Sequence, residues 1–69
     1  MSINQREALA DSGYKAGKAQ RHGDVASANF EHDWMRRTVR LDADPVAARQ
    51  VWEDAYREGA ANPYPVDPY

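Results

Sequence analysis

Cysteine is absent from this 69-residue chain, so neither a disulfide framework nor a thiolate metal site is available to it. No apolar run approaches the roughly 20 residues that a membrane-spanning helix needs. Residues 1–15 lack the basic start and the apolar stretch of a signal peptide. A net charge of only −2 gives no overall attraction to nucleic acid or to anionic membranes. These absences predict a soluble, cytoplasmic protein with no membrane partner.

Large aliphatic side chains are also scarce, with one Ile, two Leu and five Val against twelve Ala. Alanine-rich helices approach closely but bury little area each, and a chain of this size buries only about 60% of its unfolded surface. The core of a monomer is therefore predicted to be poor. Either tight packing around a few aromatic side chains or self-association must compensate, and we expect a homo-oligomer. The aromatic residues are Tyr14, Phe30, Trp34, Trp52, Tyr56, Tyr64 and Tyr69.

Three helices are predicted, at about residues 3–21, 25–40 and 45–58, from apolar periodicity and from the residues that start and stop helices. A helical domain would then occupy residues 1–59, and a tail would follow at 60–69. The predicted fold class is all-α. It is either a small three-helix bundle or a helical hairpin that dimerises into a bundle.

The first helix has clear signals at both ends. Ser2 with Gln5 matches a capping box at its start, and Gly23 suits the left-handed position after its last turn. Gly13 and Gly17 lie inside it, where each costs roughly 1 kcal/mol relative to alanine. That cost predicts the close approach of another backbone over these two residues.

The second helix begins after Asp24, a good N-cap. It carries two neighbouring apolar stripes, which predict contact with both of the other helices. The first stripe is Val25, Ala28, His32, Met35 and Val39, and the second is Phe30, Trp34 and Leu41.

The third helix has Asp44 as its predicted N-cap and Pro45 at its first position. Gly59 is interpreted as lying just past its end. A strongly amphipathic stripe runs between them. Because the link to the second helix is short, these two helices are expected to lie as an antiparallel pair. The stripe consists of Ala48, Val51, Trp52, Ala55 and Tyr56.

The tail contains three of the four prolines, which forbid a helix and favour an extended backbone. Tyr64, Val66 and Tyr69 make it more apolar than a typical disordered segment. We therefore predict an extended strap laid over a helical surface of its own chain or of a neighbour. An exposed partner-binding motif is the alternative.

No arrangement of residues suggests catalysis. The serines lie outside any Gly-x-Ser-x-Gly motif, and the glycines are too scattered to cradle a phosphate. Glu31, His32 and Asp33 are consecutive, so on a helix they point about 100° apart and cannot converge on a metal ion. His22 is expected at a helix end. The sequence predicts a protein that is not an enzyme and that needs no cofactor or metal.

Arg36, Arg37 and Arg40 form a basic cluster beside Trp34, which could grip phosphates and stack a base. Cations also gather at helix C-termini because they complement the helix dipole, and Asp33 is placed to pair with them within the helix. Since the chain as a whole is acidic, we adopt the second interpretation. A nucleic-acid-binding regulator remains the alternative.

The poor core, the excess of aromatic residues and the lack of a polar constellation predict a non-catalytic protein–protein interaction module. It would be an accessory protein of the kind that phages and mobile elements encode, or a structural component of an assembly such as a virion. The two tryptophans serve either the core or a binding hot spot. The candidate partner-binding residues are Trp34, Met35, Trp52, Tyr56, Tyr64 and Tyr69.

Overall fold

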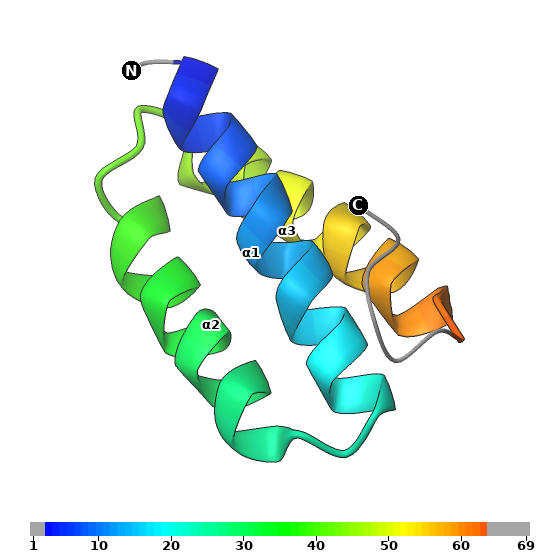
Figure 1. Ribbon diagram of the computed structural model, residues 1–69. Helices are drawn as coiled ribbons and strands as arrows, with labels where there is room; N and C mark the ends of the chain where they lie inside the picture. The colour runs from blue at the N-terminus through cyan, green and yellow to red at the C-terminus, as the bar shows by residue number, and fades with distance from the viewer. Residues whose placement is uncertain (1–2, 64–69) are drawn as a thin grey trace.

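The computed structural model describes residues 3–63, with side chains from residue 5 onward. Three helices make up this part of the chain: α1 at Ile3–Arg21, α2 at Val25–Val39 and α3 at Pro45–Ala61. α2 returns alongside α1, and α3 then runs again in the general direction of α1 (Figure 1). The predicted all-α bundle is therefore confirmed. Ser2 and the tail from Tyr64 onward, where the strap was predicted, lie outside the described residues.

The end of α1 forms as predicted, at Gly23, whose φ of 81° is left-handed. The Gly23 N–H donates to the carbonyl of Gln20 at 3.2 Å, and the Asp24 N–H donates to that of Ala19 at 2.8 Å. This pair of bonds is a Schellman motif, which satisfies the last carbonyls of a helix. It reverses the chain in a few residues, so α2 can return along α1.

Aspartates begin the two later helices, which confirms both predicted N-caps. The Asp24 carboxylate accepts from the Ser27 N–H at 3.1 Å, and the Asp44 carboxylate accepts from the Ala47 N–H at 3.1 Å. Pro45 occupies the first turn of α3, where its missing N–H would have no intrahelical partner.

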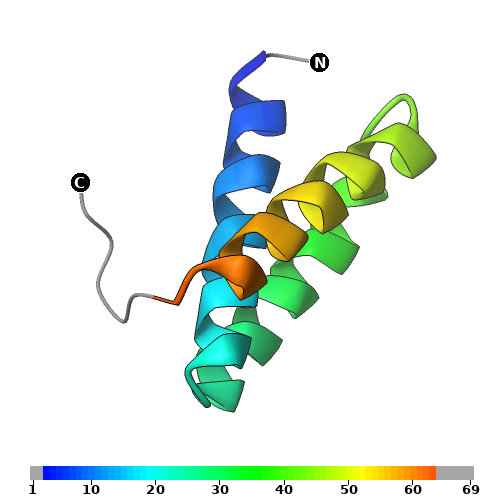
Figure 2. The ribbon, with the colours of Figure 1, turned by 90° about the vertical axis from the view of Figure 1, so that its right-hand side faces the viewer.

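α3 packs against α1 much more extensively than against α2, and glycine makes the close approach possible. A Cβ on Gly13 would lie 2.1 Å from the Trp52 carbonyl oxygen, and one on Gly17 would lie 2.0 Å from that of Tyr56. Real Cβ atoms essentially never come within 3.0 Å of such an atom. The predicted approach of a backbone over Gly13 and Gly17 is thus confirmed. Figure 2 shows the two helices crossing obliquely.

Gly59 on α3 likewise allows the backbone of α1 to approach closely. A Cβ there would lie 2.1 Å from the carbonyl oxygen of Tyr14 on α1. The interpretation of Gly59 as a residue past the helix end is therefore wrong, because α3 continues to Ala61 and buries Gly59 within it. The helix ends instead at Asn62, its C-cap, whose side-chain amide donates to the Tyr14 hydroxyl.

The expected pairing of the second and third helices also needs correction. α2 and α3 do run in opposite directions (Figure 1), but the contact between them is the smallest in the fold. α3 lies on α1 instead. The reason is that glycine and alanine faces let these two backbones meet, and dispersion attraction grows with the number of atoms in contact.

The core is small and rich in alanine. Leu9 and Met35 are its largest fully buried side chains, and Trp52 is only 4% exposed. The composition predicted either tight packing around a few aromatic side chains or self-association. Tight packing is present, and self-association stays a prediction. The core cluster consists of Leu9, Ala16, Met35, Val39, Ala48 and Trp52.

Candidate functional site

A hydrogen-bonded network joins the three helices in the interior. The Trp52 indole N–H donates to the Ser12 hydroxyl at 3.1 Å, and that hydroxyl donates to Oε1 of Glu31 at 2.8 Å. The Trp52 ring also meets the edge of His32, with centroids 5.6 Å apart, and stacks with Tyr56 at 5.4 Å. A buried indole needs a partner for its single donor, and Ser12 supplies it.

Two of the candidate partner-binding residues therefore belong to the interior. Met35 is fully buried and Trp52 is nearly so, which makes both of them structural in this fold. Trp34 and Tyr56 are only partly buried and reach the surface. Tyr64 and Tyr69 lie outside the described residues.

Among the described residues, neither histidine belongs to a group that could hold a metal ion. His22 is exposed in the turn after α1, and His32 is half-buried against Trp52. Within the part of the chain that the structure describes, no three His, Cys, Asp or Glu side chains come together as metal ligands would.

The side of α2 that faces away from the core carries exposed apolar residues. Phe30 is 65% exposed, and Leu41, in the turn directly after the helix, is 83% exposed. Trp34, one turn after Phe30, is half-buried and also packs against the core. Met35 and Val39 occupy the opposite side, in the core. We call Phe30, Trp34 and Leu41 the apolar row of α2.

A shallow hollow of about 300 Å³ opens beside the apolar row, between α1 and α2. Its size suits one large apolar side chain from another molecule. Because helices border it on two sides, it has the form of a short groove. It is lined by Ala8, Asp11, Ser12, Phe30, Glu31 and Trp34.

The predicted arginine cluster lies on the other flank of the apolar row. Arg36, Arg37 and Arg40 surround a second shallow hollow of about 230 Å³ together with Asp33. Arg36 is 4.0 Å from Asp33, and both side chains are more than half exposed. Within residues 5–63, no ion pair involves Arg37 or Arg40. The expected pairing with Asp33 is thus confined to Arg36, and it is long and exposed, which makes it weak.

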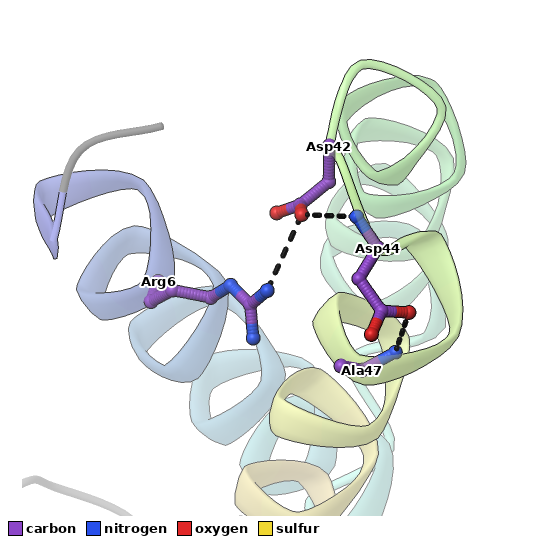
Figure 3. Close-up of polar contacts among 4 residues, drawn as sticks. All are labelled: Arg6, Asp42, Asp44 and Ala47. Atoms are coloured by element: carbon purple, nitrogen blue, oxygen red, sulfur yellow. Dashed lines mark hydrogen bonds and ion pairs between the residues drawn. The ribbon is translucent and has the colours of Figure 1, made fainter.

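The turn that carries Leu41 is fixed by a buried carboxylate (Figure 3). The Asp42 side chain is 1% exposed, and it accepts from Arg6 at 3.2 Å and from the backbone N–H of Asp44 at 2.9 Å. The Asp44 N–H lowers the pKa of the Asp42 carboxyl; burial opposes this effect and Arg6 adds to it. Because Asp42 is held inward, its neighbour Leu41 is held outward at the end of the apolar row.

The sequence predicts the apolar row, but of its three residues only Trp34 makes the expected contact with the interior. Both stripes of α2 were expected to pack on neighbouring helices, whereas Phe30 and Leu41 face solvent. The apolar surface of α2 is wider than its two neighbouring helices can cover, because both neighbours lie on the same side of it. That excess width is the signal in the sequence that some of these residues are exposed. Arg6 and Asp42 were not singled out, because they lie 36 residues apart and form no local pattern.

Comparisons with protein-family models, with curated proteins and with solved structures find no match to this chain. Among residues 3–63, no helix is both long and apolar enough to cross a membrane. The candidate site therefore rests on the geometry of α2 and its surroundings.

Proposed function

We propose that this protein is a non-catalytic interaction module that binds another protein through the apolar row of α2. The observation that carries the proposal is that exposed Phe30 and half-buried Trp34 lie one turn apart on α2, with exposed Leu41 in the turn directly after this helix. Single exposed apolar residues such as Val46 are common and need no explanation. An aligned set beside an apolar hollow is different, because one partner can cover all of it at once.

The energetics favour such a role. Full burial of a side chain such as Phe30 or Leu41 contributes about 1.5–3 kcal/mol each. Trp34 belongs to the residue type most enriched at binding hot spots, and its half-buried ring is already held in place. A row on a packed helix is ordered before binding, so little conformational entropy is lost when a partner covers it.

Site-specific photo-crosslinking in cells that make the protein tests this proposal. A benzophenone amino acid replaces Phe30 in one variant and Val25 in a matched control, since Val25 is also exposed on α2 but lies outside the row. We expect a discrete protein adduct from position 30 that is absent from position 25 and is lost when Leu41→Ser is added. Equal labelling from both positions, or none, would refute the proposal.

One observation favours a second candidate function. Arg37 and Arg40 lack an ion-pair partner within residues 5–63, and Arg37 lies one turn after Trp34 on α2. This arrangement supports single-stranded nucleic-acid binding, in which cations follow the backbone and an aromatic ring stacks a base. Such binding would weaken steeply as salt rises and would disappear in an Arg36/Arg37/Arg40 triple alanine variant. A gel shift that survives these substitutions would exclude it.

We also propose that the tail is a strap over a helical surface and that the protein is cytoplasmic and self-associates. The Asn62 side chain bonds to Tyr14 and the Arg21 guanidinium donates to the Ala60 carbonyl at 3.0 Å, so the end of α3 is anchored on α1 where the tail begins. Deleting residues 64–69 should lower the melting temperature by several degrees, because the strap covers apolar surface. An unchanged melt would contradict the strap, and a concentration-independent mass in sedimentation would contradict self-association.

A further inference from the structure

The apolar row of α2 has unmatched positive charge along one flank. On one flank, Arg37 and Arg40 have no ion-pair partner within residues 5–63, and Arg36 has only the long contact to Asp33. A guanidinium presents several donors in a planar fork, which suits a carboxylate in a bidentate geometry. The charge that a partner would meet on this flank is therefore positive.

The acidic groups on the opposite flank already have partners. Asp11, at the edge of the hollow, pairs with Lys15 at 2.9 Å, and this contact raises the pKa of Lys15. Glu31 accepts the hydroxyl hydrogen of Ser12 at 2.8 Å. The Asp11 charge is therefore matched by Lys15, whereas Glu31 has a neutral donor and keeps its negative charge beside the hollow. The arginine flank is the place where a partner's carboxylates would fit.

From these observations we infer that the occupant of the apolar row is an acidic amphipathic helix of another protein. Its apolar side chains would cover Phe30, Trp34 and Leu41, with one of them seated in the hollow against α1. Its carboxylates would meet Arg37 and Arg40. From Phe30 to the end of α2 at Val39 is nine positions, or about 14 Å along the helix, and Leu41 lies in the turn just beyond, so the occupant needs about three turns. The inference rests on the proposed function and specifies the chemistry of its partner.

A helix fits this place better than a second copy of the chain does. The hollow lies between two helices, and an amphipathic helix laid in such a groove adds a further helix to the bundle. A second copy that pairs the two rows antiparallel about a twofold axis would bring the two sets of unmatched arginines toward one another. Like charges at close range destabilise an interface, so the charge disfavours that form of self-recognition.

The experiment uses the complete protein and three synthetic peptides of about 18 residues, long enough to form a helix. The first carries leucines on one face and glutamates beside them. The second replaces every glutamate by lysine, and the third has the composition of the first with the leucines scattered. Binding of the dye-labelled peptides is followed by fluorescence anisotropy at low and at physiological salt.

The acidic amphipathic peptide should bind at least about tenfold more tightly than the lysine peptide, and more weakly as salt rises. Phe30→Ser and Arg37→Glu should each reduce its affinity about tenfold or more, since each removes a main contact. Val25→Ser and Arg57→Glu are the matched controls: both residues are exposed, and neither lies on the row or its flank. These two should change the affinity less than about twofold. Circular dichroism of each variant verifies that the helices are intact.

Other outcomes would overturn the inference. If the lysine peptide binds as well as the acidic one and still requires Phe30, the partner is not acidic, although the proposed function stands. If no peptide binds and the crosslink at position 30 is also absent, the inference about the partner and the proposed function are both refuted. Binding of an oligothymidine of about 20 nucleotides that requires Arg37, without peptide binding, would assign the surface to nucleic acid. Self-association abolished by Phe30→Ser would assign it to a second copy.

Discussion

Replacing Gly17 by alanine tests whether the close approach of α1 and α3 holds this fold together. Helix propensity alone predicts a gain, because alanine in a helix interior is about 1 kcal/mol more favourable than glycine. The packing predicts the opposite. The new Cβ would lie 2.0 Å from the Tyr56 carbonyl oxygen, where 3.0 Å is the practical minimum. The sign of the change in stability therefore decides between the two effects.

The size of the loss in stability follows from how far α1 and α3 must move apart. The two backbones must separate by about 1 Å, and a gap of 0.5–1 Å already forfeits about a quarter to a half of each dispersion contact across it. Overpacking of this kind costs about 1–3 kcal/mol or more, and here the obstructing atom is backbone and cannot rotate away. Taking the upper value of about 3 kcal/mol for this clash and subtracting the propensity gain of about 1 kcal/mol leaves a net loss of about 2 kcal/mol. The total stability of a domain of this size is about 3–10 kcal/mol. The melting temperature should fall by about 8–16 °C.

Thermal and urea unfolding followed by circular dichroism would measure this loss. Gly13→Ala and Gly59→Ala should show the same sign, because each new Cβ would meet a carbonyl oxygen at 2.1 Å. Gly23→Ala is the control for adding a methyl group: it meets nothing within 4 Å, and its cost of about 1–2 kcal/mol comes from the left-handed φ alone. A Gly17→Ala variant as stable as the parent, or more stable, would refute the packing argument.

Three further predictions concern side chains that form hydrogen bonds: Ser12, Asp42 and Asp44. Ser12→Ala leaves the buried Trp52 N–H without its acceptor and should cost about 1–3 kcal/mol in urea unfolding; an unchanged midpoint would show that the bond does not matter to stability. Because folding lowers the pKa of Asp42, its contribution is complete above the ordinary carboxyl pKa of about 3.9 and is lost as pH falls through the lower folded value. Asp42→Asn should thus be less stable than the parent at neutral pH, and the difference in melting temperature should narrow in acid; a constant difference would contradict this. Asp44→Ala should cost about 1 kcal/mol by removing the N-cap bond to Ala47, and Asp44→Ser should restore most of it.

Helix ends were predictable wherever a local interaction causes them. Asp24 and Asp44 each act on an N–H three residues away, and Gly23 acts on carbonyls of the turn before it, so the pattern is legible in the sequence. Gly59 shows the limit of such reading. Glycine serves either a left-handed φ or a close approach, and only the three-dimensional position of Tyr14 reveals which of the two applies.

The close packing of α1 on α3 had a partial signal in the sequence. Gly13 and Gly17 predicted that some backbone approaches α1, but not which one. On α3, Ala55 and Gly59 repeat the same four-residue spacing of small residues, and these are the complementary positions. Reading the two spacings together would have identified the partner helix, whereas the short link to α2 pointed to a different pair.

The exposure of the apolar row follows from the same geometry. A helix in a three-helix bundle has neighbours on one side only, so part of a second apolar stripe stays uncovered. Phe30 and Leu41 are exposed, while Trp34 still packs against the core. Ala28, Met35 and Val39 take the core side of α2, and the bond from Ser12 to Glu31 is compatible only with that orientation. Turning α2 to bury Phe30 would break this bond and expose Met35. The packing of α2 thus fixes which of its apolar residues stay exposed. Because these residues are held in place before any partner binds, the row has the order that a preformed binding surface requires.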